Sequence, residues 1–354
     1  MEKGKGKVRM IFRRGFEKIK RENGNMERVR RQVGLEESLR DEQFAKEIQV
    51  SGGQEDWMKR RVTVGVLDTG IGAHPDLRGK VVGFQDFVGR NRMMYDDNGH
   101  GTHICGIIAG SGGESGGRMR GMAPGSRLVV GKVLDQNGEG MTKHMLEALD
   151  WILEVRKQYQ IRVLNISVGI GEMSDKKKQE ALQSKIEEVW SEGIVVVCAA
   201  GNKGPMDGSI SAVSGSERVI TVGCHDGSYG KDNPKQCSTY SGRGKFADRI
   251  RKPDVVAPGT DIYSCNVNYR GTNHVYGIHQ PGKVLSKEAY VAKSGTSMAT
   301  PIVTGAIALL LQKFPDMSNE DVKRKLTYTA TDLGEAWNLQ GWGMINVRKM
   351  LEKY

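Results

Sequence analysis

Between Val62 and the C-terminus, short apolar runs alternate with longer segments in which apolar side chains recur every three or four positions. The short runs are rich in Val and Ile, which is typical of strands covered on both faces. The longer segments predict helices, and the regular alternation of strand and helix indicates βαβ units around a parallel sheet. The predicted strands are 62–67, 127–133, 163–166, 194–198, 219–222 and 254–257. The predicted helices are 101–109, 142–157, 174–192, 298–313 and 319–329.

The first 53 residues show a different pattern, in which a few apolar residues at near-helical spacing stand among many charges. Those apolar residues are Val8, Ile11, Phe12, Phe16 and Ile19, and Ser51-Gly-Gly53 is typical of a linker. We therefore divide the chain into a basic, helical leader or short pro-segment at 1–53 and a second unit at 54–354. An arm docked on the second unit is the favoured interpretation of the leader. A pro-segment that blocks a cleft and a membrane-surface helix are the alternatives.

Composition describes a globular chain: 38% of its 354 residues are hydrophobic, with 47 Gly and 9 Pro. No run approaches the roughly 18 apolar residues of a membrane-spanning helix, so we expect no stable membrane insertion. The basic N-terminus is not followed by the apolar core of a signal peptide, which favours a cytoplasmic location and leaves unmarked export open.

The net charge of +11 comes largely from the leader, where the first 31 residues hold twelve Lys/Arg and four Asp/Glu. No helix-turn-helix, zinc-finger or aromatic RNA-binding motif accompanies this charge, so nucleic acid is not expected as a partner. The five cysteines are odd in number and irregularly spaced, without a C-x-x-C pair. We expect free thiols rather than a disulfide framework or a zinc site.

Three motifs carry residues suited to nucleophilic catalysis. Asp68 ends the apolar run 62–67, and His100 lies in Asn98-Gly-His-Gly-Thr-His103. Ser297 lies in Ser294-Gly-Thr-Ser-Met-Ala-Thr-Pro301, directly before the predicted helix 298–313. Unpaired N–H groups and a positive dipole end make the start of a helix a place where an oxyanion is stabilised. A serine hydroxyl needs a base, and an imidazole oriented by a carboxylate is suited to that role.

The order Asp, His, Ser in these motifs resembles that of the subtilisin-like serine proteases, the subtilases, and within them the bacterial intracellular type. The likeness runs from about Val62 to the C-terminus. It implies an α/β fold, a three-layer sandwich with a central, mostly parallel β-sheet flanked by helices. It also implies a serine endopeptidase in which Asp68, His100 and Ser297 form the triad. The first histidine of the motif would be catalytic and His103 structural.

The same resemblance assigns further residues to the site. Asn202, after the run 194–198, would complete the oxyanion hole with the Ser297 N–H. A peptide or protein substrate would bind as an added strand between two edge segments. The residues expected to contact it are Gly138, Gly140, Ser167, Val168, Gly169, Ala199, Ala200, Gly201 and Thr296. Glu139 would then favour basic substrate side chains, and the leader would be a candidate inhibitor.

The chain departs from the family pattern at several points. Asp76 matches a calcium-binding carboxylate of secreted relatives, but the partner loop is replaced by 110–117, so no metal site is assigned and no cofactor is required. Weak calcium or sodium binding stays open, including weak cation binding near Asp254. The segment 209–215 lacks a proline that is common in this family. That proline lies in the wall of the pocket that binds the substrate side chain before the scissile bond. The segment 266–293 is longer than usual, and its His274 and His279 are loop residues or metal ligands.

Two other functions remain open at this point. A pseudoprotease would bind peptides without cutting them, and a maturation protease would cut one cellular peptide. Dibasic pairs at 13–14, 30–31 and 60–61 further suggest that an active enzyme removes its own leader.

Overall fold

The computed structural model describes residues 26–36, 61–168, 176–227, 236–269 and 286–353. A seven-stranded sheet with strand order β2-β3-β1-β4-β5-β6-β7 forms its centre, and all neighbouring strands are parallel. The strands are β1 (Thr63–Asp68), β2 (Val81–Asp86), β3 (Arg127–Lys132), β4 (Ile161–Ile166), β5 (Val195–Ala199), β6 (Ile220–Cys224) and β7 (Val255–Ala257). Strand order reverses beside β1, so the carboxyl ends of β1 and β4 flank the switch point where α/β folds bind ligands.

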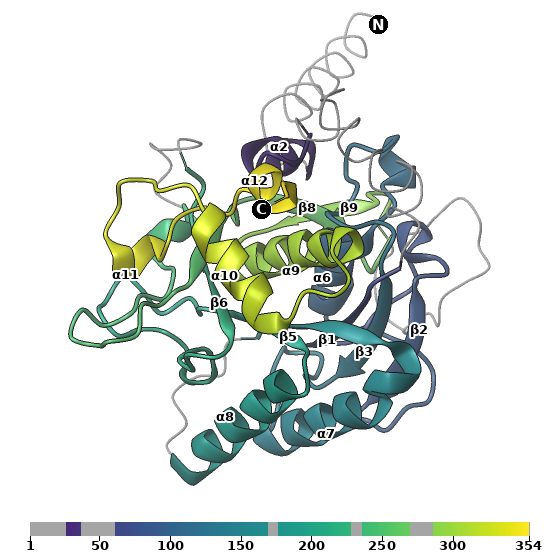
Figure 1. The fold of residues 1–354 in the computed structure, drawn as a ribbon. Coiled ribbons are helices and arrows are strands. Elements are labelled where there is room, and N and C mark those ends of the chain that lie inside the picture. The colour runs from purple at the N-terminus through teal and green to yellow at the C-terminus, as the bar shows by residue number, and fades with distance from the viewer. Residues whose placement is uncertain (1–25, 37–60, 169–175, 228–235, 270–285, 354) are drawn as a thin grey trace, which may run out of the picture.

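Helices cover both faces of this sheet and create three layers (Figure 1). Helices α7 (Thr142–Tyr159) and α8 (Lys176–Ser191) lie on one face. Helices α6 (His100–Ala109), α9 (Thr296–Lys313) and α10 (Asn319–Thr329) lie on the other. Helix α9 is buried on nearly all sides, which explains why its sequence is apolar all round. The predicted α/β sandwich is confirmed.

Several smaller elements complete the fold. Strands β8 (Ile262–Cys265) and β9 (Tyr290–Lys293) form a separate antiparallel pair, which pairs Ile262 with Lys293 at one end. Short helices α11 (Trp337–Gln340) and α12 (Val347–Leu351) follow α10. Within the described ranges, no helix is long and apolar enough to cross a membrane.

A part of the leader docks on this body as helix α2 (Met26–Gln32), beside α12 (Figure 1). Met26, Val29 and Val33 are buried, and the Val347 N–H donates to Val33 O. Arg30 is also buried and donates to Glu36 and to Arg120 O. The dibasic pair 30–31 therefore lies in a docked helix, whereas 1–25 and 37–60, with the other leader residues discussed above, fall outside the described residues.

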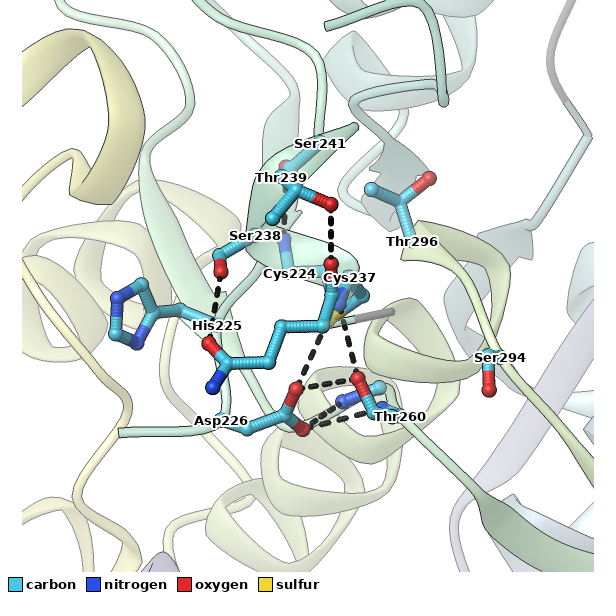
Figure 2. Close-up of a disulfide and its surroundings, with 12 residues drawn as sticks. Cys224, His225, Asp226, Cys237, Ser238, Thr239, Ser241, Thr260, Ser294 and Thr296 are labelled. Carbon is cyan, nitrogen blue, oxygen red and sulfur yellow. Dashed lines mark hydrogen bonds between the residues drawn. A yellow bond between two sulfur atoms is a disulfide. The ribbon is translucent and has the colours of Figure 1, made fainter. Parts of the chain in front are cut away.

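The expectation of five free thiols is wrong for one pair. Cys224, at the end of β6, forms a disulfide with Cys237, and their Cα atoms are 5.6 Å apart (Figure 2). Cys105, Cys198 and Cys265 are free and buried. Irregular spacing gave no sign of this pair because the fold, and not the local sequence, brings residue 237 back to the end of β6.

Candidate active site

Asp68 and His100 come together at the carboxyl edge of the sheet. Asp68 is the last residue of β1 and is fully buried, and His100 is the first residue of α6. The His100 Nδ1 atom lies 2.7 Å from Asp68 Oδ1, which also accepts the Thr69 N–H at 2.8 Å. Because Nδ1 faces a carboxylate, it carries the proton, and Nε2 is left as the basic atom.

Opposing effects act on the pKa of His100. Burial lowers it, but the charge of Asp68 and its hydrogen bond outweigh burial, so the pKa is raised above its usual value. The charge of Lys293, four residues before Ser297, acts in the opposite direction to Asp68. Lys293 ends β9, and its partner strand β8 packs against α6, the helix that begins with His100.

A second buried carboxylate, Asp96, fixes the loop that carries His100. Its Oδ1 accepts the Gly99 N–H at 2.7 Å and the Thr69 hydroxyl at 2.9 Å. Its Oδ2 accepts both the N–H and the hydroxyl of Thr102. The start of α6 is thereby attached to the residue after Asp68. Sequence reasoning missed this residue, because a run such as Asp96-Asp97-Asn98-Gly99 is typical of a turn.

Ser297 is half-buried at the second position of α9. The preceding Gly295 has φ +146°, a conformation rarely adopted by residues with a side chain, and its carbonyl accepts the Met298 N–H at 3.0 Å. The first N–H groups of α9 have no partner within the helix, as at the start of any α-helix. Helices α6 and α9 pack against each other, so the motifs of His100 and Ser297 lie on neighbouring helices.

Asn202 lies beside the start of α9. Its Oδ1 accepts the Thr296 N–H at 3.1 Å and the Thr296 hydroxyl at 3.0 Å. These two donors define the amide orientation, since only the oxygen can accept them. The Nδ2 donor group is thereby directed away from Thr296. Thr296 is also among the residues expected to contact substrate, and its hydroxyl is bound to Asn202.

The expected substrate contacts lie on two sides of this region. Ser167 and Val168 directly follow β4, while Gly169 falls outside the described residues. Gly138 and Gly140 are exposed on a turn that is closed by hydrogen bonds to Asp135. The Asn98 side chain joins that turn to the catalytic loop, because Nδ2 donates to Gln136 O and Oδ1 accepts the His100 N–H, each at 3.1 Å.

The third group of expected contacts follows β5. Ala199 ends that strand, and Ala200 and Gly201 are buried after it. Backbone bonds from Ser211 N–H to Ala200 O and from Gly242 N–H to Gly201 O fix this segment at 2.8 and 2.7 Å. The segment 209–215, which lacks the usual proline, is therefore attached to the predicted pocket wall by its backbone.

Lys132 was not singled out from the sequence, whereas His103 was expected to be structural. The fully buried Lys132 ammonium donates to Thr69 O, Leu134 O and Asp97 at 2.6–2.8 Å, and so connects the end of β1, the segment after β3 and the loop before His100. His103 is fully buried, with Nε2 3.0 Å from the carbonyls of both Ile262 and Val291. Burial lowers its pKa to about 3, which keeps it neutral and fits a structural role across β8 and β9.

The carboxylates considered for metal binding already hold protein donors. Asp76 accepts the hydroxyls of Tyr290 at 2.7 Å and Ser111 at 3.1 Å. Asp254 lies 2.7 Å from the Lys252 ammonium and 3.1 Å from that of Lys323. Two ammonium groups neutralise Asp254, which therefore fits a sodium or calcium ion poorly. His274 and His279 fall outside the described residues.

Comparison with known proteins places this geometry in a family. A model of the Subtilase family matches residues 59–343. The chain belongs to the subtilase family. Serine protease AprX of Bacillus subtilis (strain 168) is 39% identical over 293 residues, which make up 80% of this chain and 65% of that relative. The chain thus spans less than two thirds of that relative's length.

Other subtilases match over most of their own length. Subtilisin DY of Bacillus licheniformis is 33% identical over 289 residues, covering 81% of this chain and 89% of the relative. Among solved structures, Sphericase superposes with a TM-score of 0.66 at 25% identity, covering 81% of this chain and 94% of its own. The resemblance inferred from the three motifs is confirmed.

Proposed function

We propose that this subtilase is a serine endopeptidase in which Asp68, His100 and Ser297 act as the triad. The observation that carries the proposal is the 2.7 Å contact between His100 Nδ1 and the buried Asp68 carboxylate. It leaves the imidazole with a basic Nε2, on a helix packed against the one that carries Ser297 in its first turn. Membership of the subtilase family supports the same roles.

In the proposed reaction, His100 Nε2 takes the proton of the Ser297 hydroxyl as Ser297 Oγ attacks the peptide carbonyl. The imidazolium that forms is stabilised by Asp68. His100 then gives the proton to the leaving amine, and an acyl-enzyme forms on Ser297. In the second half, His100 activates water, which releases the acyl group and restores the serine.

The carbonyl oxygen gains negative charge in both halves of this reaction. We propose that the Ser297 N–H and the Asn202 Nδ2 group donate to it, because Thr296 holds Oδ1 and directs Nδ2 away from the helix. Each step uses a group of this chain, so the proposal needs no cofactor. Any calcium or sodium bound elsewhere would affect stability rather than these steps.

The substrate is proposed to bind as an added strand between the segments after β3 and β4. Gly138 and Gly140 would form one edge, and Ser167, Val168 and Gly169 the other. Ala199, Ala200 and Gly201 would line the pocket for the side chain before the scissile bond. Exposed Glu139 would favour basic substrate side chains, a preference that Glu139→Gln should remove in peptide-library profiling.

We also propose that 54–354 is the catalytic unit and that 26–36 of the leader remains docked on it. Inhibition would then have to come from residues outside this docked part. A cytoplasmic location stays a prediction, and the disulfide argues against it, because such bonds are typical of oxidising compartments. Alkylation of thiols in acid-quenched cells would decide between a cytoplasmic location and an oxidising compartment, because it shows whether Cys224 and Cys237 are reduced or bonded in the cell.

A fluorophosphonate probe tests the proposed function directly. Wild type should be labelled on Ser297 and should cleave an internally quenched peptide, and Ser297→Ala should lose both. Intact mass of the two proteins would report removal of the leader in the same experiment. If folded wild type is neither labelled nor active, the pseudoprotease is supported instead. Labelling of Ser297→Ala equal to that of wild type would refute the assignment of the nucleophile.

A further inference from the structure

Asp226 is a buried carboxylate for which the proposed reaction has no use. It follows β6 and is 1% exposed. Within the described ranges it forms no ion pair with Lys, Arg or His. Instead, Oδ1 accepts the N–H groups of Gly259 and Thr260, both at 3.1 Å, and Oδ2 accepts the Thr260 hydroxyl. Burial of a charge without a counter-ion is costly, so these bonds are what stabilises it there.

The backbone that Asp226 holds is in direct contact with the start of α9. Gly259 O accepts the Gly295 N–H at 2.9 Å. A side chain on Gly259 would lie 2.3 Å from Cys224 Sγ and 2.7 Å from Gly295 O, so the two glycine segments are closely packed. A Cβ on Gly295 would lie 3.3 Å from Asn202 Nδ2. The contacts therefore run from Asp226 through Gly259 and Gly295 to the oxyanion donor.

Two other parts of the chain support this carboxylate, the disulfide region, shown in Figure 2, and the docked leader. The Cys237 N–H donates to Thr260 Oγ1 at 2.9 Å, and the disulfide fixes Cys237 to the end of β6. From the leader, Gln32 of α2 donates to Asp226 O, and Arg28 donates to Thr260 O at 3.2 Å. Asp226 thus follows β6 directly, lies beside the disulfide and the docked leader, and contacts the start of α9 through Gly259.

We propose that Asp226 is a positioning residue for the oxyanion hole, acting through the Gly259–Thr260 backbone on Gly295 and Asn202. The inference rests on the proposed function, since it assigns a role in that same site. A shift of the Gly295 segment would misplace the Ser297 N–H and Asn202 Nδ2 relative to the oxyanion. Because that charge develops only in the transition state, the effect falls on kcat rather than on KM.

The test compares Asp226→Asn with Asp86→Asn as a matched control. Asp86 is also buried and accepts backbone N–H groups, from Val88, Gly89 and Asn91, but outside the oxyanion region. We expect Asp226→Asn to lower kcat at least about 10-fold on a peptide p-nitroanilide, with KM changed less than about 3-fold. The Ki of a peptide aldehyde, which forms a tetrahedral adduct, should rise by the same factor as kcat/KM falls. Asp86→Asn should leave kcat within about 2-fold.

A double-mutant cycle with Asn202→Asp identifies the route of the effect. If Asp226 acts through the oxyanion hole, Asp226→Asn should cost less than about 3-fold in kcat once Asn202 has lost its donor. The same 10-fold loss in both backgrounds would overturn the proposal. Unchanged kcat in folded Asp226→Asn would also overturn it, while Ser297-dependent activity of wild type would still support the proposed function.

A second pair of variants covers a failure of Asp226→Asn to fold. Thr260→Val removes the hydroxyl that donates to Asp226 and accepts from Cys237, and Thr260→Ser keeps it. A kcat lowered about 5-fold in Thr260→Val and restored in Thr260→Ser would support the proposal. Equal kcat in folded Thr260→Val and wild type would overturn it.

Discussion

Reduction of the Cys224–Cys237 disulfide should lower the stability of the protein by an amount that follows from its position. The two cysteines are 13 residues apart in the sequence. In the chain-entropy model, a closed loop of this size restricts the unfolded state by about 3 kcal/mol at 25 °C. At about 2.1 cal/mol/K of unfolding entropy per residue over 354 residues, that corresponds to a Tm lowered by about 4 °C.

The measurement is thermal unfolding with and without dithiothreitol in the Ser297→Ala background, where the proposed nucleophile cannot cause autolysis. Alkylation in guanidinium gives the redox state: three cysteines should react before reduction and five after it. The double variant Cys224→Ala/Cys237→Ala is the control, and dithiothreitol should not change its Tm. If three cysteines react before reduction and the two Tm values still agree within about 1 °C, the entropic argument is refuted. Reaction of all five without reductant would show that the pair does not form.

Three further predictions test the site and its surroundings. Since the pKa of His100 is raised and its neutral form is the base, kcat/KM should fall at acid pH with an apparent pKa above 6.5. Lys293→Gln removes a positive charge that lowers this pKa, so the apparent pKa of kcat/KM should rise, whereas Lys293→Arg keeps the charge and should leave it unchanged. Asn202→Asp keeps the oxygen that accepts from the start of α9 but loses the amide donor, so kcat should fall at least about 100-fold with little change in KM. Tyr290→Phe removes a hydroxyl that donates to the buried Asp76 carboxylate, so the free energy of unfolding measured in urea should fall by about 1–3 kcal/mol. The control is Tyr328→Phe at a side chain that is 85% exposed, which should change this free energy by less than about 0.5 kcal/mol.

The main sheet could be predicted where burial on both faces produced unbroken apolar runs. The predicted strand 62–67 corresponds to β1 (Thr63–Asp68), and helix 319–329 agrees with α10 at both ends. Strand β2 was missed because it lies at the edge of the sheet, and its half-exposed side chains give no continuous apolar run. Strands β8 and β9 were missed because they are four residues each and pair over a long separation in the chain.

The motifs of Asp68, His100 and Ser297 could be recognised because residue type and chain order together are informative. The residues that hold those motifs in place could not be recognised from the sequence, since their role depends on burial. Asp96 and Asp226 each precede turn-like residues, and a sequence gives no reason to bury either one. The Cys224–Cys237 pair likewise depends on where the chain returns after β6.

Asp96 and Asp226 solve the same physical problem on the two sides of the site. At each place an irregular backbone segment lies against the start of a helix, and its N–H groups have no sheet or helix partner. Asp96 accepts the Gly99 N–H before α6 and both the N–H and the hydroxyl of Thr102 in its first turn. Asp226 accepts two N–H groups and one hydroxyl in the segment that contacts Gly295 before α9. A lysine beside either one would stabilise the charge but would also compete for these bonds. A buried carboxylate that forms no ion pair within the described residues can therefore accept hydrogen bonds from the backbone N–H groups and hydroxyls around it. This is how the two helices that carry His100 and Ser297 can begin at fixed positions on one edge of the sheet.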